Sequence, residues 1–245
     1  MIDDVVVRAP IGAYLPYRGT RVIERTGWYQ LITPGTTGAN EVLFSPGDAD
    51  VATVMAEYAA ARVPRFRWCV WPWAEALEAP LLAHGFERWE ARAMVAERHA
   101  LAIAAPRDVL VEEVVAIGAR FDAYLDTLVT GWEQSPEERA ELAACLARVL
   151  AEPARRHRFY LASCEGVPVG TGGFVIQPEA IYLTGGNVLP AFRGRGIYRA
   201  LIAARLADAG GARYITTHAR AHTSAPILER LGFRTAASYR VFLSP

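Results

Sequence analysis

The feature that most constrains the fold of this chain is an internal repeat, in which the second half resembles the first. A shift of 147 positions lays Gly85-Phe86 on Gly232-Phe233, and the same shift lays Leu81 on Leu228. It also lays a predicted helix, 48–62, on a second one, 195–209, and a predicted strand, 66–71, on another at 213–217. Since one order of strands and helices keeps one offset, we interpret the chain as a duplication. Two unrelated α/β domains with similar local patterns are the alternative.

The composition is that of a folded chain with a sizeable core. Of its 245 residues, 52% are apolar and 21% are charged, which excludes a disordered chain, a collagen and a simple coiled coil. No stretch approaches the roughly 20 apolar residues of a membrane helix, and two acids, Asp3 and Asp4, stand where a secretory signal has basic residues. Cys69, Cys145 and Cys164 fall outside any disulfide or metal motif. We therefore expect a cytoplasmic protein without a metal site.

The charges balance, because 26 basic residues, all of them arginine, face 26 acidic ones. A net charge of zero argues against nucleic acid and against an anionic membrane surface as partners. The absence of lysine and the many alanines are typical of codon bias in a GC-rich bacterial genome. Any anion that the protein binds must therefore meet a local group of arginines.

Hydrophobic periodicity predicts a mixed α/β fold in two domains, 1–105 and 106–245, joined by a linker at 102–106. Residues 1–20 are expected to be an irregular lead-in. Strands are predicted at 28–33, 41–44, 66–71, 86–95, 109–115, 159–164, 168–176, 181–189, 214–217 and 233–243. Helices are predicted at 48–62, 72–84, 119–131, 136–152, 195–209 and 224–231. The helix at 136–152 has a clear start, because Ser135 precedes Pro136.

The segment 187–201 contains the strongest functional signal. A strand ends, a loop presents Arg193-Gly194-Arg195-Gly196, and a helix begins at once. Glycines let the backbone approach a ligand, and the free N–H groups and positive dipole end of the helix suit a phosphate. The loop is not a Walker motif, which needs a lysine, nor a dinucleotide fingerprint, which needs glycine in place of Arg199. A plain tight turn is the alternative.

Two motifs at the expected spacing resemble those of the GNAT superfamily of N-acetyltransferases. The loop from Arg193 to Tyr198 is similar to motif A, and the segment 225–233, ending in Leu231-Gly232-Phe233, is similar to motif B. The resemblance covers roughly residues 108–245 and implies a GNAT fold there. The first half resembles only the later part of that fold, and it has Pro46-Gly47-Asp48 where the loop should fall. It looks like a degenerate GNAT-like copy without a CoA site, so that the whole chain is a tandem.

The resemblance implies transfer of an acetyl group from acetyl-CoA to a primary amine, here of a small molecule, by direct attack. It implies that the pantetheine arm binds at Asn187, Val188 and Leu189, and that the pyrophosphate binds at Arg193, Gly194, Arg195, Gly196, Ile197 and Tyr198. A non-catalytic acyl-CoA-binding or sensor protein is the alternative function, and acetylation of proteins is a third. The sequence leaves the acceptor open, and it leaves a monomer and a homodimer open.

The usual catalytic positions of the family are altered. The acid of many relatives is a tyrosine in motif B, where this chain has Leu228, and their base is a glutamate on the fourth strand, where it has Tyr182. His218, at the end of the strand 214–217, is the candidate base, with packing of the strand end as the alternative. Tyr182 is a candidate proton donor or a core residue, and Ser224 a candidate catalytic hydroxyl or a helix cap.

The acceptor site is less defined. The family's acceptors enter beside the first two helices of the domain, where Asp126, Trp132 and Glu133 are candidates for contacting a cation. A surface or packing role is the preferred interpretation of each. The aromatic group Trp68, Trp71 and Trp73 of the first half is expected to belong to the core, with closure of the cleft as the alternative.

Overall fold

The computed structural model describes residues 2–245, and its elements follow an order that repeats between the halves. The first half contains α1 (Ile2–Arg8), β1 (Arg21–Arg25), β2 (Trp28–Ile32), β3 (Glu41–Leu43), α2 (Val51–Ala60), β4 (Arg67–Val70), η1 (Pro72–Leu77), α3 (Glu78–Ala83) and β5 (Glu87–Glu97). The second contains η2 (Arg98–Ala100), β6 (Val109–Glu113), α4 (Ala119–Trp132), α5 (Pro136–Ala151), β7 (His157–Cys164), β8 (Val167–Ile176), β9 (Ala180–Val188), η3 (Pro190–Phe192), α6 (Ile197–Ala207), β10 (Tyr214–Arg220), α7 (Ser224–Arg230) and β11 (Arg234–Leu243).

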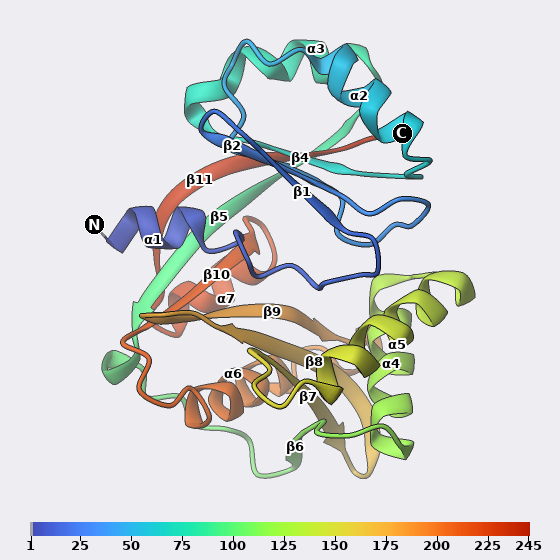
Figure 1. Cartoon of the computed structure of the whole chain (residues 1–245). Coiled ribbons are helices and arrows are strands. Elements are labelled where there is room, and N and C mark those ends of the chain that lie inside the picture. The colour runs from blue at the N-terminus through green and yellow to red at the C-terminus, as the bar shows by residue number, and fades with distance from the viewer. Residues whose placement is uncertain (1) are drawn as a thin grey trace.

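The strands form one mixed sheet in the order β1-β2-β3-β4-β11-β5-β10-β9-β8-β7-β6. The last strand of each half is therefore inserted into the other half: β11 lies between β4 and β5, and β5 lies between β11 and β10. Figure 1 shows these two long strands, green and red, running side by side from one half to the other. The C-terminus consequently ends in the first half, where Ser244 and Phe66 exchange hydrogen bonds.

The strand order confirms the duplicated, tandem arrangement. In each half an antiparallel pair (β2·β3, β8·β9) is followed by a parallel pair (β3·β4, β9·β10), and a helix connects the two parallel strands. Antiparallel pairing of β5 with β11 sets Ala91 opposite Tyr239 and Arg92 opposite Ser238. Under the 147-residue shift Ala91 corresponds to Ser238 and Arg92 to Tyr239, so a pseudo-twofold axis passes between these residues.

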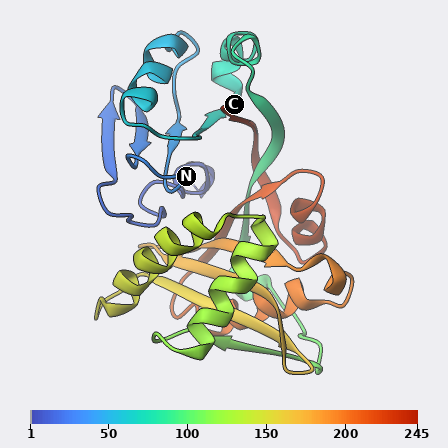
Figure 2. The same cartoon turned by 90° about the vertical axis from the view of Figure 1, so that its right-hand side faces the viewer.

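The helices cover the sheet with separate apolar clusters. Helices α6 and α7 pack on one face of the second half, through Leu201 and Leu228 among others. Helices α4 and α5 cover the opposite face, through Leu125 and Leu146 among others, and Figure 2 shows them in front of these strands. In the first half α2 and α3 pack around Trp68. Among the helices of residues 2–245, none is long and apolar enough to span a bilayer.

The expected lead-in differs from the structure at two places. Residues Ile2–Arg8 form α1, and Arg21–Arg25 form β1 against β2. Helix α1 contacts β5 and β11 through Val6, which is fully buried between the halves. Its docking explains why a segment of only seven residues is helical, because isolated helices of that length are unstable in water. The expected linker, 102–106, is free of helix and strand.

Candidate functional site

Helix α6 presents an uncapped N-terminus after the glycine loop. Its N-cap is Gly196, at φ +77°, and no side chain accepts a hydrogen bond from the first turn. Gly194 also has a positive φ, of +82°, so the loop uses a backbone conformation that other residues rarely adopt. The free N–H groups and the dipole of α6 thus form an anion site of the kind that phosphates occupy.

Three arginines surround this helix end. Arg193, Arg195 and Arg199 are exposed, and the ion pairs found within residues 2–245 include none of them. Arg193 donates to the Val188 carbonyl at 3.2 Å, which ties the loop to the end of β9. Their positive charge is therefore available to a ligand, and the residues present fit the pyrophosphate of acetyl-CoA.

Strands β9 and β10 separate beside the loop. Their parallel pairing ends at Leu183 opposite Thr217, after which β9 continues to Val188 along β8 and β10 continues to Arg220 along β5. The N–H of Leu189 donates to Val169 on β8. Because N–H directions alternate along a strand, the N–H of Val188 points into the opening between β9 and β10. A backbone donor at this position suits a carbonyl oxygen that becomes negative.

Two side chains beside the end of β9, Asn187 and Tyr198, differ in their surroundings. The Asn187 side chain contacts α4, where its amide donates to the Leu128 carbonyl at 3.5 Å, and its buried Oδ1 atom has no partner. On α6, Tyr198 lies against Gly186 of β9: a Cβ atom added to that glycine would be 3.0 Å from the ring. Burial raises the pKa of Tyr198, so its hydroxyl stays protonated at neutral pH.

His218 lies between the two halves. Its Nε2 atom is 3.0 Å from the Val6 carbonyl and its Nδ1 atom is 2.9 Å from the Tyr239 hydroxyl. Because a carbonyl only accepts, Nε2 carries the proton and Nδ1 accepts from Tyr239. Desolvation by burial, partly offset by the bond to Val6, lowers the pKa of His218 to about 4. A catalytic role for His218 stays a prediction, and it requires release of the nitrogen that Tyr239 now engages.

The other candidates for proton transfer occupy different places. Tyr182 packs edge-on against His218, with ring centroids 5.7 Å apart, and burial raises its pKa. Ser224 is the half-buried first residue of α7, whose N-cap, Thr223, makes no side-chain cap bond. Leu228, where many relatives have their acid, is fully buried in the core beneath α7. The roles of Tyr182 and Ser224 remain predictions.

The candidates for acceptor binding lie in the middle of α4 and at its C-terminal end. Asp126 is paired with Arg139 at 2.7 Å, Trp132 is exposed, and Glu133 ends the helix with a φ of +54°. In the first half, Trp68 and Trp71 are buried as expected for core residues, whereas Trp73 is 57% exposed and stacks on Trp71. Trp71 also stacks on Tyr239, so the aromatic group lies beside His218.

The N-terminus of α2, the counterpart of α6, is closed. Its N-cap is Asp50, whose carboxylate accepts from the N–H groups of Ala52 and Thr53. Phe44, at the end of β3, stacks on Trp71 with ring centroids 5.6 Å apart. The first half thus has an acid at the helix end and aromatic rings where β3 and β4 end.

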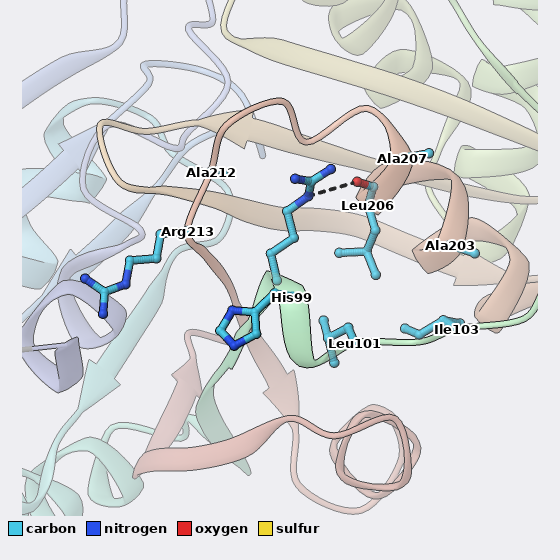
Figure 3. Close-up of a pocket in the computed structure, with 9 residues that line it drawn as sticks. His99, Leu101, Ile103, Ala203, Leu206, Ala207, Ala212 and Arg213 are labelled. Carbon is cyan, nitrogen blue, oxygen red and sulfur yellow. Dashed lines mark hydrogen bonds between the residues drawn. The ribbon is translucent and has the colours of Figure 1, made fainter.

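A separate cavity of about 460 Å³ lies at the other end of α6. Its lining is Arg98, His99, Leu101, Ile103, Ala203, Leu206, Ala207, Ala212 and Arg213 (Figure 3). Arg98 donates to the Leu206 carbonyl at the end of the helix, and Figure 3 shows Arg213 pointing away from the apolar residues. This cavity is remote from Gly196, which begins the same helix.

Several residues of the site escaped the sequence analysis. Tyr239 of β11 and Val6 of α1 contact His218. Both residues are far from His218 in the sequence, so no local sequence pattern predicts these contacts. Arg205, a buried residue of α6 that the sequence analysis also passed over, follows Ile197 and Leu201 at a spacing of four on the apolar face of the helix. A charged residue on the apolar face of a predicted helix is a signal that the sequence already contains.

Comparisons with known proteins agree with this geometry. Residues 120–233 match the model of the acetyltransferase (GNAT) family. Among solved structures, a conserved protein of unknown function from Staphylococcus epidermidis has a TM-score of 0.73 at 16% identity, covering 94% of this chain and 95% of its own. A GCN5-related N-acetyltransferase from Kribbella flavida has a TM-score of 0.67 at 19% identity, covering 100% and 96%.

A tandem GNAT protein from the clavulanic acid biosynthesis pathway has a TM-score of 0.54 at 14% identity, covering 99% of this chain and 87% of its own. No curated protein matches the sequence. At such identities the solved structures show the fold alone, and the family model matches residues 120–233. Residues 120–233 therefore match the GNAT acetyltransferase family, and the chain as a whole has the fold of a tandem of two GNAT-like halves.

Proposed function

We propose that the second half transfers the acetyl group of acetyl-CoA to a primary amine of a small molecule by direct attack. The observation that supports it best is the uncapped N-terminus of α6 beside the opening between β9 and β10. In this proposal the loop from Arg193 to Tyr198 binds the pyrophosphate, and the strand end at Asn187, Val188 and Leu189 binds the pantetheine arm. Acetyl-CoA supplies the activated acyl group. No metal takes part.

The backbone N–H of Val188 then donates to the thioester oxygen as negative charge develops on it. An amine attacks only when it is neutral, so a proton must leave it first, through His218 or through water. The leaving thiolate needs a proton that Leu228 cannot supply, and we propose Tyr182 or water as its source. We place the reaction in the cytoplasm, since Cys69, Cys145 and Cys164 are buried free thiols.

The altered acid and base positions favour a second function, that of a non-catalytic acyl-CoA sensor. One experiment separates the two functions. Calorimetry with acetyl-CoA measures binding, and thiol release in the presence of a broad panel of small primary amines measures transfer. If the protein is an acetyltransferase, we expect one acetyl-CoA site per chain and release of CoA with at least one amine. Binding at one site without release from any amine supports the sensor, and absence of binding rejects both functions.

A further inference from the structure

Arg205 is an unusual charge, because it lies wholly inside the second half. Its side chain is 1% exposed, and within residues 2–245 no carboxylate pairs with it. Its hydrogen bonds all go to main-chain carbonyls: Nε donates to Leu201 at 2.9 Å, and Nη1 to Gly173 at 3.0 Å and to Thr184 at 3.5 Å. Its Nη2 atom is buried without a partner.

Stability alone does not account for this residue. Burial of an uncompensated guanidinium costs several kcal/mol, and desolvation lowers the pKa of Arg205. An apolar side chain of similar volume would fill the place at lower cost. The sheet also makes room for it, because a Cβ atom on Gly172 would lie 3.1 Å from the guanidinium carbon. Such a costly arrangement points to a function.

The guanidinium contacts the sheet where β9 leaves β10. Thr184 follows Leu183, the last residue of β9 that pairs with β10. Between the pairs Gly173–Thr184 and Thr171–Asn187 the register shifts, so that Gly185 and Gly186 lie opposite Gly172 alone. This is a β-bulge, and Gly185 has a φ of +61°. Arg205 therefore binds the pair of carbonyls at one edge of the bulge.

We infer that Arg205 is a positioning residue for the acetyl-CoA site. By binding the carbonyls of Gly173 and Thr184 it fixes the bulge, and the bulge sets the direction of the following strand end, including the Val188 N–H. It acts through the backbone and touches no substrate. This inference rests on the proposed acetyl-CoA site and adds the residue that holds one side of it in place.

The test compares two ligands that share their phosphates. Acetyl-CoA has the pantetheine arm, and adenosine 3′-phosphate 5′-diphosphate lacks it. For Arg205→Met we expect the Kd of acetyl-CoA to rise about tenfold, a loss of roughly one hydrogen bond, and the Kd of the nucleotide to change less than twofold, because the α6 N-terminus is intact. Arg205→Lys, which keeps a donor, should fall between. Ile202→Ala, a cavity variant on the same helix, should leave both constants unchanged.

Gly172→Ala provides a second route, because it displaces the guanidinium without removing it. We expect the same selective loss of acetyl-CoA binding, and no further loss when it is added to Arg205→Met. The inference is overturned if Arg205→Met binds acetyl-CoA as the wild type does, or if it loses both ligands equally. If the wild-type chain binds neither ligand, the proposed site itself is refuted, and the inference with it.

Discussion

The N-termini of α2 and α6 occupy equivalent places in the two halves and differ in what surrounds their first N–H groups. At α2 the carboxylate of Asp50 accepts from the first N–H groups, whereas at α6 Gly196 leaves them free beside three arginines. Any helix end needs partners for these donors. In the first half a side chain of the protein provides the partner, and in the second half we propose that a ligand does. The N-cap residue and its surroundings thus distinguish the capped helix end from the open one, which we propose as the binding end.

The largest effect is expected from separating the halves. Strand β11 pairs with β4 and β5, and β10 pairs with β5 on one side, and both β4 and β5 belong to residues 1–105. Residues 106–245 alone would therefore expose both edges of β11 and one edge of β10. We expect this fragment to be unfolded or aggregated, and to fold when mixed with residues 1–105. Circular dichroism and gel filtration of the fragments measure this. A 106–245 fragment that is monomeric and cooperatively folded would show that the halves are independent domains after all.

The next largest effect concerns the open helix end. Gly196→Asp places a carboxylate at the free N–H groups, as Asp50 does in α2, and any side chain there also meets Pro106 and a φ of +77°. We expect no measurable binding of acetyl-CoA by calorimetry. Gly27→Asp is the matched control, since Gly27 has a φ of +82° in open space. Binding by the Gly196 variant at the strength of the wild type would remove α6 from the proposed site.

The sequence was enough to predict those features that depend on interactions between residues close together in the chain. The glycine loop, the Ser135 cap of α5 and the repeat of elements are confirmed, because each depends on neighbouring residues. The exchange of β5 and β11 was not predicted, since alternation within a strand does not name its partner. The sequence analysis noted Asp48 in place of the glycine loop and predicted no cap, and the structure shows that Asp50 caps α2.

A smaller effect is expected at the contact between the halves. Trp71 and His218 are counterparts under the 147-residue shift, and their rings lie 5.9 Å apart. The pKa of His218 is about 4 in the folded protein and about 6.5 in the unfolded chain. Because the unfolded chain binds the proton more readily, the free energy of unfolding decreases as the pH falls from 6.5 to 4, by at most about 3 kcal/mol. His218→Gln should lose less stability over this range, as denaturant unfolding at pH 7 and pH 4.5 would measure.

His222→Gln is the control for that comparison, because His222 is exposed in the next loop. If His218→Gln shows the same pH dependence of stability as the wild type, the imidazole of His218 does not account for the loss of stability in acid. The same variant tests the predicted base: loss of a positioned base lowers kcat by roughly 10²–10⁴, while acetyl-CoA affinity stays unchanged. If His218→Gln keeps near-normal turnover, water accepts the proton of the amine, and the role of His218 is to pack against α1.

The smallest effect is expected from Asp50→Ala, which opens the closed helix end. Hydrogen bonds from Thr53 hold the pKa of Asp50 below its usual value, so its stabilising effect is present at neutral pH and is lost as the pH falls through that value. We expect a slightly lower Tm at pH 7 and a smaller difference from wild type in acid. Asp48→Ala, also exposed and two residues earlier, is the control.

Removal of the Asp50 carboxylate should not create a second acetyl-CoA site at the N-terminus of α2, because Phe44 and Trp71 still stack beside it. Calorimetry that finds two equivalents bound per chain would mean that the carboxylate of Asp50 alone keeps the first half from binding.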